Sequence, residues 1–454
     1  MHIKIAGKYK LSAVQILALG FAAVILLGAI LLSLPISTNS GNSTSFIDSL
    51  FTSTSAVCVT GLVTLDTATH WNYFGRTVII VLIQIGGLGF MSFTTLLAVI
   101  IGKKITLKER LLLQEALNTF GIQGMVKLMK YIFSFTFAVE GLGALLLSTQ
   151  FIPQFGFWKG LYYSVWTSIS AFCNAGFDLM GSVSGKFSSI TSYQNNPVII
   201  YTISALIIIG GLGFAISSEF YNYKERKKLS LHTKVVLIIT GILLFGGAIL
   251  MFIFEYSNPA TLGPMGLGEK INNAFFASVT TRTAGFNTIN TDGMTMAGKF
   301  LTVLLMFIGG SPGSTAGGLK TATFGILVVT LISIIKGRDD VEIFKRRISK
   351  ETVYKAFAIF FLSLSLVITV ILLLAATQPG ANFMWIVYES VSAYATVGLS
   401  LGLTQKLNFI GKIIILVTMY LGRVGPMTVL LALTSKMKKK KVNIKYPEDK
   451  ILIG

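Results

Sequence analysis

Charged residues are scarce in this chain, and so are cysteine and histidine. Asp, Glu, Lys and Arg make up 12% of the 454 residues, while 53% are hydrophobic. A soluble domain carries about twice that charged fraction. The two cysteines, Cys58 and Cys173, provide no disulfide framework, and the three histidines lack the spacing of metal ligands. These shortages argue against a soluble single-core domain, a disulfide-stapled secreted fold and a metal centre.

Long apolar runs stand where charge is missing. The segments 14–35, 78–101 and 235–254 each have the length of about 20 residues that crosses a bilayer as a helix. The first run lacks a small-x-small cleavage site, so it is not expected to be a removed signal peptide. The sequence therefore predicts an all-α polytopic membrane protein.

The net charge is +20, and the basic clusters of the chain stand between pairs of apolar runs or at the chain ends. These clusters lie at 4–10, 103–110, 224–228, 336–347 and 436–441, while the alternate loops near 37–50, 153–159 and 257–268 have almost no Lys or Arg. The positive-inside rule then places both termini in the cytoplasm of a multi-pass plasma-membrane protein. Short basic clusters beside spans indicate contact with the lipid bilayer, and no nucleic-acid partner is expected.

Four segments, spaced roughly 110 residues apart, share one pattern that ends in glycine. They are TSTSAVCVTGL (52–62), TSISAFCNAGF (167–177), FASVTTRTAGF (276–286) and ESVSAYATVGL (389–399). An aromatic residue stands ten positions before each glycine, and Ser stands six positions before it except in the third segment, which has Val279. The period has room for two spans and a half-span.

Each repeat is predicted to be a helix–pore-loop–helix unit. The units cover 12–102, 103–223, 224–336 and 337–437, and a basic cytoplasmic tail covers 438–454. The first spans are expected at 14–35, 127–150, 233–254 and 353–376, and the second spans at 76–101, 197–221, 297–335 and 411–435. Four covalently linked units can surround one pseudo-four-fold pore.

The short segments cannot cross the membrane, so they must enter from the outer face and turn back. Non-helical backbone at membrane depth is tolerated where it lines water or is buried in protein. Glycine leaves carbonyl oxygens open to an axis, and rings of carbonyls replace the hydration shell of potassium in selective filters. The predicted selectivity filter consists of Val59, Thr60, Gly61, Asn174, Ala175, Gly176, Thr283, Ala284, Gly285, Thr396, Val397 and Gly398. Close helix packing is the alternative for each glycine.

The stretch GGSPGSTAGGLKT (309–321) interrupts the second span of the third unit. Its spacing to Lys320 is one residue too long for a phosphate-binding loop, and no strand precedes it. We interpret it as a mobile constriction below the filter, with a plain kink as the alternative. The predicted gate comprises Gly309, Gly310, Ser311, Pro312, Gly313, Ser314, Thr315, Ala316, Gly317, Gly318 and Lys320, together with Arg423.

Several ionisable side chains lie in or near the apolar runs. Arg423 is predicted to face the pore near the loop and to hold the gate shut, with pairing to a carboxylate or to carbonyls as the alternative. The acids of the outer loops, Asp66, Asp178, Glu269 and Asp292, either concentrate cations at the mouth or are solvated loop residues. Glu140, in mid-span, is open between hydrogen-bonded packing and a transport role.

The tetrapeptide Thr396-Val397-Gly398-Leu399 resembles the start of the potassium-channel filter threonine-valine-glycine-tyrosine-glycine. Four degenerate filters on one chain resemble the Trk/Ktr/HKT superfamily of potassium transporters over residues 12–440, and GGSPGSTAGGLKT with Arg423 is most similar to the KtrB-type membrane subunit. The resemblance implies potassium uptake, sodium-stimulated in many members. It also implies a homodimer with one pore per chain and a cytosolic ring of nucleotide-binding regulators of the KtrA or KtrC type. No cofactor is expected beyond transported potassium and, in such members, sodium.

Two other classes of membrane protein compete with a pore. An alternating-access secondary transporter is usually built from inverted repeats, whereas every unit here is expected to enter from the inside. A membrane enzyme needs convergent His, Asp or Cys groups in the bundle, and the pattern predicts none. The chain also lacks a dinucleotide-binding glycine fingerprint, so a nucleotide-sensing regulator must be a separate protein.

Overall fold

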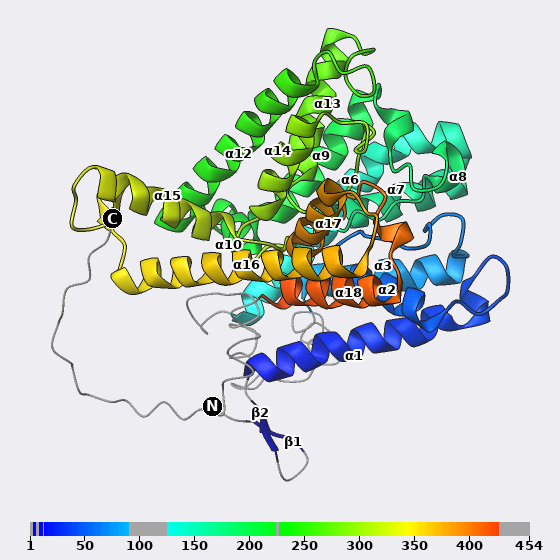
Figure 1. Cartoon of the computed structure of the whole chain (residues 1–454), viewed down its shortest axis with the longest axis horizontal. Helices are drawn as coiled ribbons and strands as arrows, with labels where there is room; N and C mark the ends of the chain where they lie inside the picture. The colour runs from blue at the N-terminus through cyan, green and yellow to red at the C-terminus, as the bar shows by residue number, and fades with distance from the viewer. Residues whose placement is uncertain (1–2, 6–8, 12, 90–124, 224–226, 426–454) are drawn as a thin grey trace.

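The computed structural model describes residues 3–5, 9–11, 13–89, 125–223 and 227–425. The described chain is helical apart from two short antiparallel hairpins, β1 (Ile3–Ile5) with β2 (Tyr9–Leu11) and β3 (Glu342–Ile343) with β4 (Arg346–Arg347). The prediction of an all-α fold is confirmed (Figure 1). The predicted tail 438–454 and the basic cluster at 103–110 lie outside the described residues, as do the unit boundaries at 102 and 437.

Four helices of the described chain are long and apolar enough to span a bilayer. They lie in α1 (Ala13–Ser33), α6 (Met125–Phe155), α12 (Leu231–Glu255) and α16 (Lys350–Thr377). Their outward faces are apolar: in α12, Ile242, Phe245 and Ile249 are 61%, 65% and 60% exposed. Side chains of this kind would be hidden in a soluble protein, so this surface is suited to lipid.

A short helix follows each long one and packs against it. These helices are α2 (Phe46–Val57), α7 (Phe157–Phe172), α13 (Leu267–Thr280) and α17 (Phe383–Ala395). Ser45 and Asn382 cap α2 and α17 by accepting hydrogen bonds from the first turn. Their Ser and Thr residues are buried near the middle of the molecule, where an apolar core would normally lie.

A second set of helices completes the architecture: α3 (Tyr73–Leu88), α9 (Pro197–Leu212), α14 (Met296–Phe307) and α18 (Phe409–Val424). The expected second spans 76–101, 197–221 and 411–435 are each interrupted, because α3, α9 and α18 end before Gly89, Gly213 and Gly425. Residues 90–101 and 426–435 of these spans lie outside the described residues. Each of the three glycines has φ near +90°, a conformation that interrupts a helix and that other residues avoid. After Gly213 the chain turns by 95° into α10 (Phe214–Tyr221).

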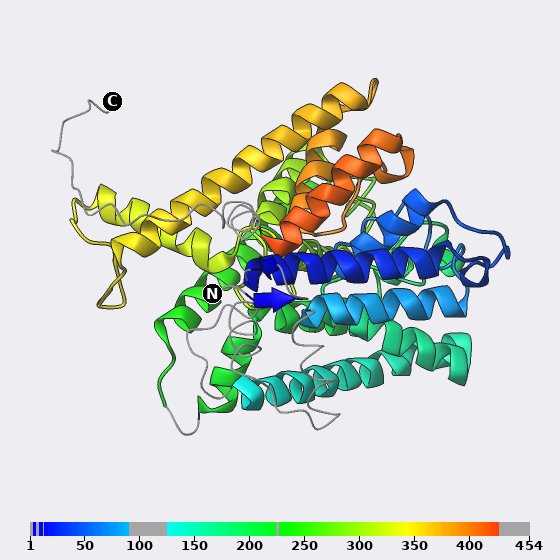
Figure 2. The same ribbon diagram turned by 90° about the horizontal axis from the view of Figure 1, so that it is seen from below.

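The helices close into a ring. Each helix of the second set contacts the short helix that follows it in the cycle: α3 contacts α7, α9 contacts α13, α14 contacts α17, and α18 contacts α2. Figure 2 shows the N-terminal α1 and the C-terminal α18 within one bundle. Tyr420 on α18 donates to the carbonyl of Ala18 on α1 at 2.7 Å, so the last part of the chain is joined to the first.

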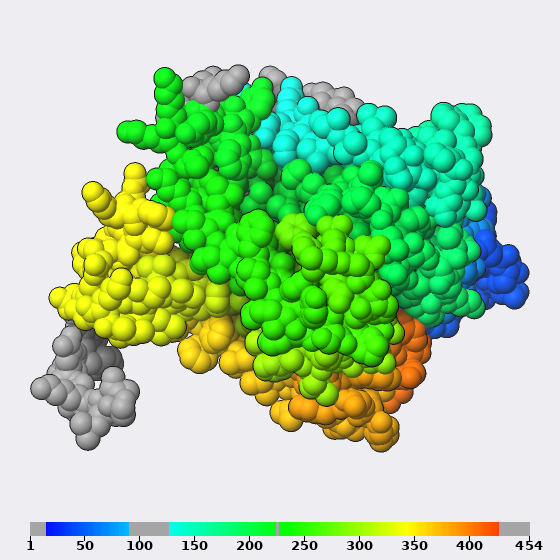
Figure 3. Space-filling view, turned by 90° about the horizontal axis from the view of Figure 1, so that it is seen from above, coloured from blue at the N-terminus to red at the C-terminus, as the bar shows by residue number. Residues whose placement is uncertain are grey.

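The remaining elements lie at the two ends of the bundle. α15 (Thr321–Ile335), the β3–β4 hairpin and the start of α16 project from one side of the molecule (yellow in Figure 3). The other elements are the one-turn helix α8 (Gly181–Ser184) and the 3₁₀ turns η1 (Pro35–Ser37), η2 (Thr191–Tyr193) and η3 (Thr404–Lys406). η2 and η3 belong to loops beside the site described next.

Candidate functional site: four glycine segments around an outer vestibule

The chain leaves each short helix in the same conformation. The residues two positions before the four repeat glycines are left-handed: Val59, Asn174, Thr283 and Thr396 have φ of 57°, 58°, 65° and 53°. The glycines also have positive φ: 96° at Gly61, 68° at Gly176, 79° at Gly285 and 92° at Gly398. Such backbone is costly for non-glycine residues and persists where the surroundings fix it. Its recurrence in four unlike segments is a shared structural feature.

Hydroxyl groups of the short helices hold these segments in place. Ser55 and Ser392, six residues before their glycines, accept hydrogen bonds from Gly61 N at 3.0 Å and Gly398 N at 3.1 Å. Ser170 instead donates to the carbonyl of Phe177 at 2.6 Å. The repeated serine therefore fixes the extended strip to its own helix.

The third segment lacks one residue relative to the others. The sequence alignment places Val279 where the other segments have Ser. In the structure, Thr280 fixes the extended strip to its helix, because it donates a hydrogen bond to the carbonyl of Phe286 at 2.5 Å. Ser278 shows the same shift: it donates to Leu244 O on the preceding long helix at 2.8 Å, as Ser53 donates to Ile25 O at 2.7 Å. Aligning the glycines without a gap hid this correspondence.

The four glycines form a closed ring. A Cβ on Gly61 would lie 2.6 Å from Ala175 O, one on Gly176 would lie 2.8 Å from Ala284 O, and one on Gly285 would lie 2.5 Å from Val397 O. A Cβ on Gly398 would collide with Thr60 O, which returns the cycle to the first segment. The carbonyls just before the four glycines therefore lie beside the neighbouring strip, and a side chain at any glycine would enter that ring.

The ring borders a cavity of about 520 Å³, the vestibule, whose lining includes all four glycines. Its walls are mostly polar and include Asp178, Asn287, Asp292, Ser400 and Gln405. Phe187 and Ser189 of the longer second loop also line it, and Ser189 accepts a hydrogen bond from Asn287 N at 3.2 Å. The cavity can hold hydrated ions next to the ring.

Two of the four predicted mouth acids face this vestibule, Asp178 and Asp292. Asp292 is bound to Lys299 at 3.5 Å and accepts from Trp385 Nε1 at 3.0 Å, which offsets its charge. Asp66 is buried, and its carboxylate accepts hydrogen bonds from Thr69 N at 2.8 Å and from Phe187 N at 2.9 Å. It therefore joins its own loop to the loop that contains Phe187. Glu269 caps the first turn of α13 and is absent from the lining of the vestibule.

Asp178 is an acid of the vestibule wall whose charge can respond to pH. Its carboxylate accepts a hydrogen bond from Met180 N at 2.8 Å. Burial raises the pKa of Asp178 to about 7, and the nearby charge of Asp66 acts in the same direction. The charge of the vestibule wall therefore changes in the neutral range.

Glycines of the second helices allow the ends of the short helices to approach closely. A Cβ on Gly86, Gly210 or Gly422 would collide with the carbonyl of Val57, Phe172 or Tyr394, respectively. Each of these carbonyls lies four residues before a ring glycine. Close packing, the alternative weighed for the ring glycines, is thus the role of this second set of glycines.

The predicted gate residues form a compact loop between α14 and α15. Its two ends are joined by hydrogen bonds from Gly309 N to Leu319 O at 2.9 Å and from Thr321 N to Gly310 O at 3.0 Å. Its tip is bound to the corner between α9 and α10: Ser311 N donates to Gly211 O at 3.0 Å and Phe214 N donates to Gly313 O at 3.0 Å. The chain is thus looped back on itself, beyond what a simple helix kink requires.

This loop lies against the left-handed residues of three glycine segments. A Cβ on Gly309 would lie 3.3 Å from Thr283 Cγ2, and one on Gly317 would collide with Thr396 Oγ1. Thr315 Oγ1 donates to Asn174 Oδ1 at 2.9 Å. Lys320 Nζ donates to Ala316 O at 2.5 Å, inside the loop. Residues of the predicted gate are therefore in contact with residues of the predicted filter.

Arg423 joins the loop to the first unit. It donates to Thr315 O on the loop and to Gly86 O and Gly87 O on α3, the last at 3.4 Å. None of the ion pairs among the described residues involves Arg423. The contacts of Arg423 are thus with carbonyl groups, as the alternative interpretation had it. One of these carbonyls, that of Thr315, belongs to the predicted gate.

Two buried charged residues of the glycine segments were missed in the sequence. Arg282 is 3% exposed and donates to Leu305 O at 2.8 Å, while its Nε and Nη1 have no hydrogen-bond partner among the described residues. Glu389 is fully buried and accepts from Ser400 Oγ at 2.8 Å and from Thr404 Oγ1. Each is the single charged residue in its repeat segment, and this isolated charge in the sequence could have marked it as a candidate for the site.

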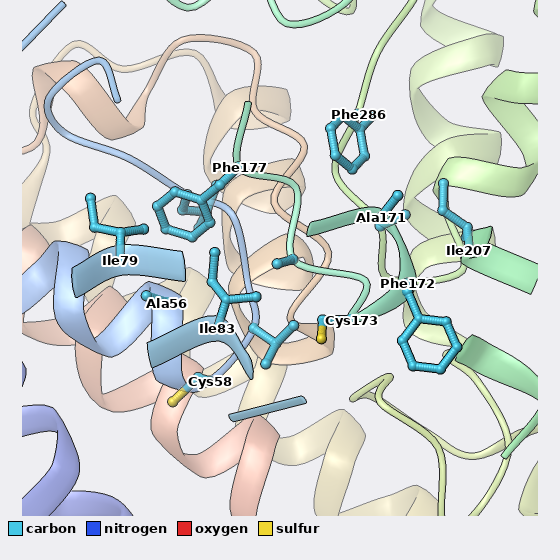
Figure 4. Close-up of a cluster of buried hydrophobic side chains, with 14 of the residues drawn as sticks. Ala56, Cys58, Ile79, Ile83, Ala171, Phe172, Cys173, Phe177, Ile207 and Phe286 are labelled. Atoms are coloured by element: carbon cyan, nitrogen blue, oxygen red, sulfur yellow. The ribbon is translucent and has the colours of Figure 1, made fainter. Parts of the chain in front are cut away.

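The mid-span acid and the repeat cysteines have packing roles in the structure. Glu140 accepts from Gln84 Nε2 at 3.1 Å, in line with the hydrogen-bonded interpretation. Cys58 and Cys173 are buried beside apolar side chains such as Ile83 of α3 (Figure 4), and Cys173 Sγ also donates to Gln84 Oε1 at 3.7 Å. Cys173 packs against Gly87, which has no room for a Cβ.

Fold and site together define a class: a multi-pass helical membrane protein in which four re-entrant segments surround one vestibule. The family model of TrkH, described as a cation transport protein, matches residues 13–445. The chain belongs to this family of cation transport proteins. Its relatives are named as transport or uptake proteins, which agrees with the absence of an enzymatic role expected from the sequence.

The similarity to known members extends over the full length. The chain is 47% identical over 448 residues to the potassium/sodium uptake protein NtpJ of Enterococcus hirae, covering 98% of each. It is 43% identical over 442 residues to the Ktr system potassium uptake protein B of Bacillus subtilis, covering 97% of this chain and 96% of the relative. The solved structure of the potassium transporter TrkH from Vibrio parahaemolyticus has a TM-score of 0.71 at 17% identity, covers 93% of this chain and 85% of its own, and supports the fold.

Proposed function

We propose that this protein takes up potassium across the plasma membrane through a gated filter pore. The pathway leads from the vestibule through the ring formed by Gly61, Gly176, Gly285 and Gly398 and then past the loop 309–321. The twelve predicted filter residues supply backbone carbonyls that replace water around the ion. Relatives named as potassium uptake proteins support the choice of ion.

The observation that carries this proposal is the ring that borders the vestibule. Four segments far apart in the sequence bring the carbonyls of Thr60, Ala175, Ala284 and Val397 beside one another. Short helices end just before these carbonyls, and their partly negative C-terminal ends favour a cation. Packing alone accounts less well for a ring that opens into a polar cavity.

The gate and its control are the second part of the proposal. The loop 309–321 lies against three segments of the ring, so it obstructs the path until it moves. Arg423 and Lys320 hold the closed position through carbonyl contacts. The proposal also includes a homodimer with one pore per chain, cytoplasmic termini, stimulation by sodium and a separate KtrA- or KtrC-type nucleotide-binding regulator. The name of the Ktr system relative of Bacillus subtilis supports one part of this, a membrane component of a system with several subunits.

The test is cation flux into proteoliposomes of the purified chain, measured in potassium and in sodium with and without the regulator protein. We expect flux that prefers potassium and that Gly398→Ser makes less selective, because the new Cβ would meet Thr60 O in the ring. Gly380→Ser is the matched control: Gly380 has a similar positive φ, but nothing lies within 4 Å of its Cβ position.

Equal potassium preference in wild type and Gly398→Ser would contradict the filter assignment and would favour an alternating-access transporter. Loss of potassium preference in both Gly398→Ser and Gly380→Ser would show that backbone strain at a positive φ causes the effect, and that the position in the ring does not. Flux of neither cation with the regulator present would contradict the uptake function itself.

A further inference from the structure

The side chain of Asn174 differs from those at the equivalent positions of the other glycine segments. The residues there are Val59, Thr283 and Thr396, and none of them carries an amide. Asn174 is fully buried, and its Nδ2 donates to Arg282 O at 2.9 Å and to Ile207 O at 3.4 Å. Arg282 lies three residues before Gly285, so this amide ties the second segment to the start of the third.

The other end of the same amide contacts the loop below the ring. Thr315 Oγ1 donates to Asn174 Oδ1 at 2.9 Å and lies 3.4 Å from the carbonyl of Phe172. Thr315 also accepts a hydrogen bond from Arg423 through its carbonyl. One residue of the loop is thus bound both to the arginine that holds the loop and to the amide that holds two ring segments.

We propose that Asn174 is a positioning residue that sets ion selectivity and that Thr315 links its orientation to the position of the loop. The inference rests on the proposed pore function and goes beyond it, since a loop that is only a plug would leave the filter unchanged when it moves. When Thr315 withdraws, Asn174 Oδ1 loses its hydrogen-bond donor in a buried site, and an unpaired amide there is unfavourable. The amide then reorients, and its bond to Arg282 O is lost with it.

The consequence is an open pore whose filter differs from that of the closed pore. The carbonyls of the second and third segments are held by Asn174 only while Thr315 is in place. Hydroxyls of Thr283 and Thr396, at the equivalent positions, are buried without a hydrogen-bond partner among the described residues, so they cannot replace this link.

The experiment uses the purified full chain without the regulator, so that the loop is in place, and measures the ratio of potassium to sodium affinity by ion competition in detergent. We expect Thr315→Val to lower the ratio about fivefold, the factor that corresponds to one ordinary buried hydrogen bond. Thr315→Ser, which keeps the hydroxyl, should retain most of the wild-type ratio. Asn174→Ala should match Thr315→Val, and the double variant should be no worse than either single one, because both remove the same link.

Thr321→Val is the matched control, because the buried hydroxyl of Thr321 has no hydrogen-bond partner in the described chain. It should keep the wild-type ratio, and a melting temperature for each variant verifies that it folds. If Thr315→Val leaves the ratio of the two affinities unchanged, or if the effects of Asn174→Ala and Thr315→Val multiply, the inference is overturned. A wild-type chain without potassium preference would overturn the pore function and this inference together, whereas a selective wild type with an indifferent Thr315→Val would overturn the inference alone.

Discussion

At the scale of single residues, the same task is performed by different side chains. Ser55 and Ser392 accept a hydrogen bond from a glycine N–H, whereas Ser170 and Thr280 donate to a carbonyl one residue beyond the glycine. A hydroxyl can do either, because it is both donor and acceptor. All four repeats therefore have a hydroxyl at this structural position, although it accepts a hydrogen bond in two of them and donates one in the other two.

The acid of the vestibule wall gives a prediction about pH. With a pKa near 7, Asp178 is about one-tenth charged at pH 6 and about nine-tenths charged at pH 8. A negative charge at the mouth concentrates cations, so potassium uptake at low concentration should rise between pH 6 and pH 8. Asp178→Asn should flatten this dependence and lower uptake at pH 8 by roughly the same factor that wild type loses at pH 6.

The measurement is the initial rate of potassium uptake against external pH, at low ionic strength because salt screens the effect. Asp292→Asn is a useful comparison, because that carboxylate is already paired with Lys299. A pH profile that is identical in wild type and Asp178→Asn would contradict this role.

At the scale of elements, the glycine breaks of the second helices matter most. A hydropathy pattern shows only that 76–101 and 197–221 are apolar, and it cannot show that Gly89 and Gly213 adopt positive φ. The re-entrant helices, the ring glycines and the intramembrane loop could be predicted, because repeated Ser/Thr patterns and glycine clusters mark them directly. The one-residue shift of the third segment could not, because it becomes visible only in the hydrogen bonds of Ser278 and Thr280.

Contacts between elements were also beyond the sequence. Arg423 was expected near the loop, but its bond to Thr315 depends on the path of a loop that has no regular secondary structure. Asn174 was named for its carbonyl, and nothing in the sequence indicates that its side chain reaches both Arg282 and Thr315. Long-range hydrogen bonds of this kind follow from the ring arrangement of the units.

Shortening the loop tests its role as an element. Deleting residues 311–316 removes Ser311 and Gly313, which bind the α9–α10 corner, and leaves the paired ends at Gly309 and Leu319. We expect potassium flux to increase and to become independent of the regulator, since the obstruction is gone. The check is uptake in proteoliposomes with and without the regulator; reduced flux in a variant that still folds would contradict the gate.

At the scale of the whole molecule, ring closure joins the two ends of the repeat array. Lys412 on α18 binds Asp48 on α2 at 2.6 Å, with 19% and 16% of their side chains exposed. Burial works against the Asp48 carboxylate, but the bonds from Lys412 and Ser45 prevail and lower the pKa of this acid. The pair is partly shielded from water, so it contributes more than a surface ion pair does.

Breaking this contact should loosen the ring. Lys412→Met leaves Asp48 unpaired and should cost about 2–3 kcal/mol, somewhat less than a fully buried pair. The exchange Asp48→Lys with Lys412→Asp should recover part of the loss. Thermal unfolding of the purified protein in detergent is the measurement, with Lys355→Met, which removes the exposed pair with Glu351, as the control that should change little. Equal losses in both lysine variants would contradict a special role for the closing contact.

The most direct test of the central claim is to locate the ion. The protein would be crystallised in rubidium or thallium, which substitute for potassium, and the anomalous scattering would be mapped. The account predicts a peak on the axis of the ring, among the carbonyls of Thr60, Ala175, Ala284 and Val397. An occupied cation site elsewhere in the membrane, for example beside Glu140, together with an empty ring would contradict it.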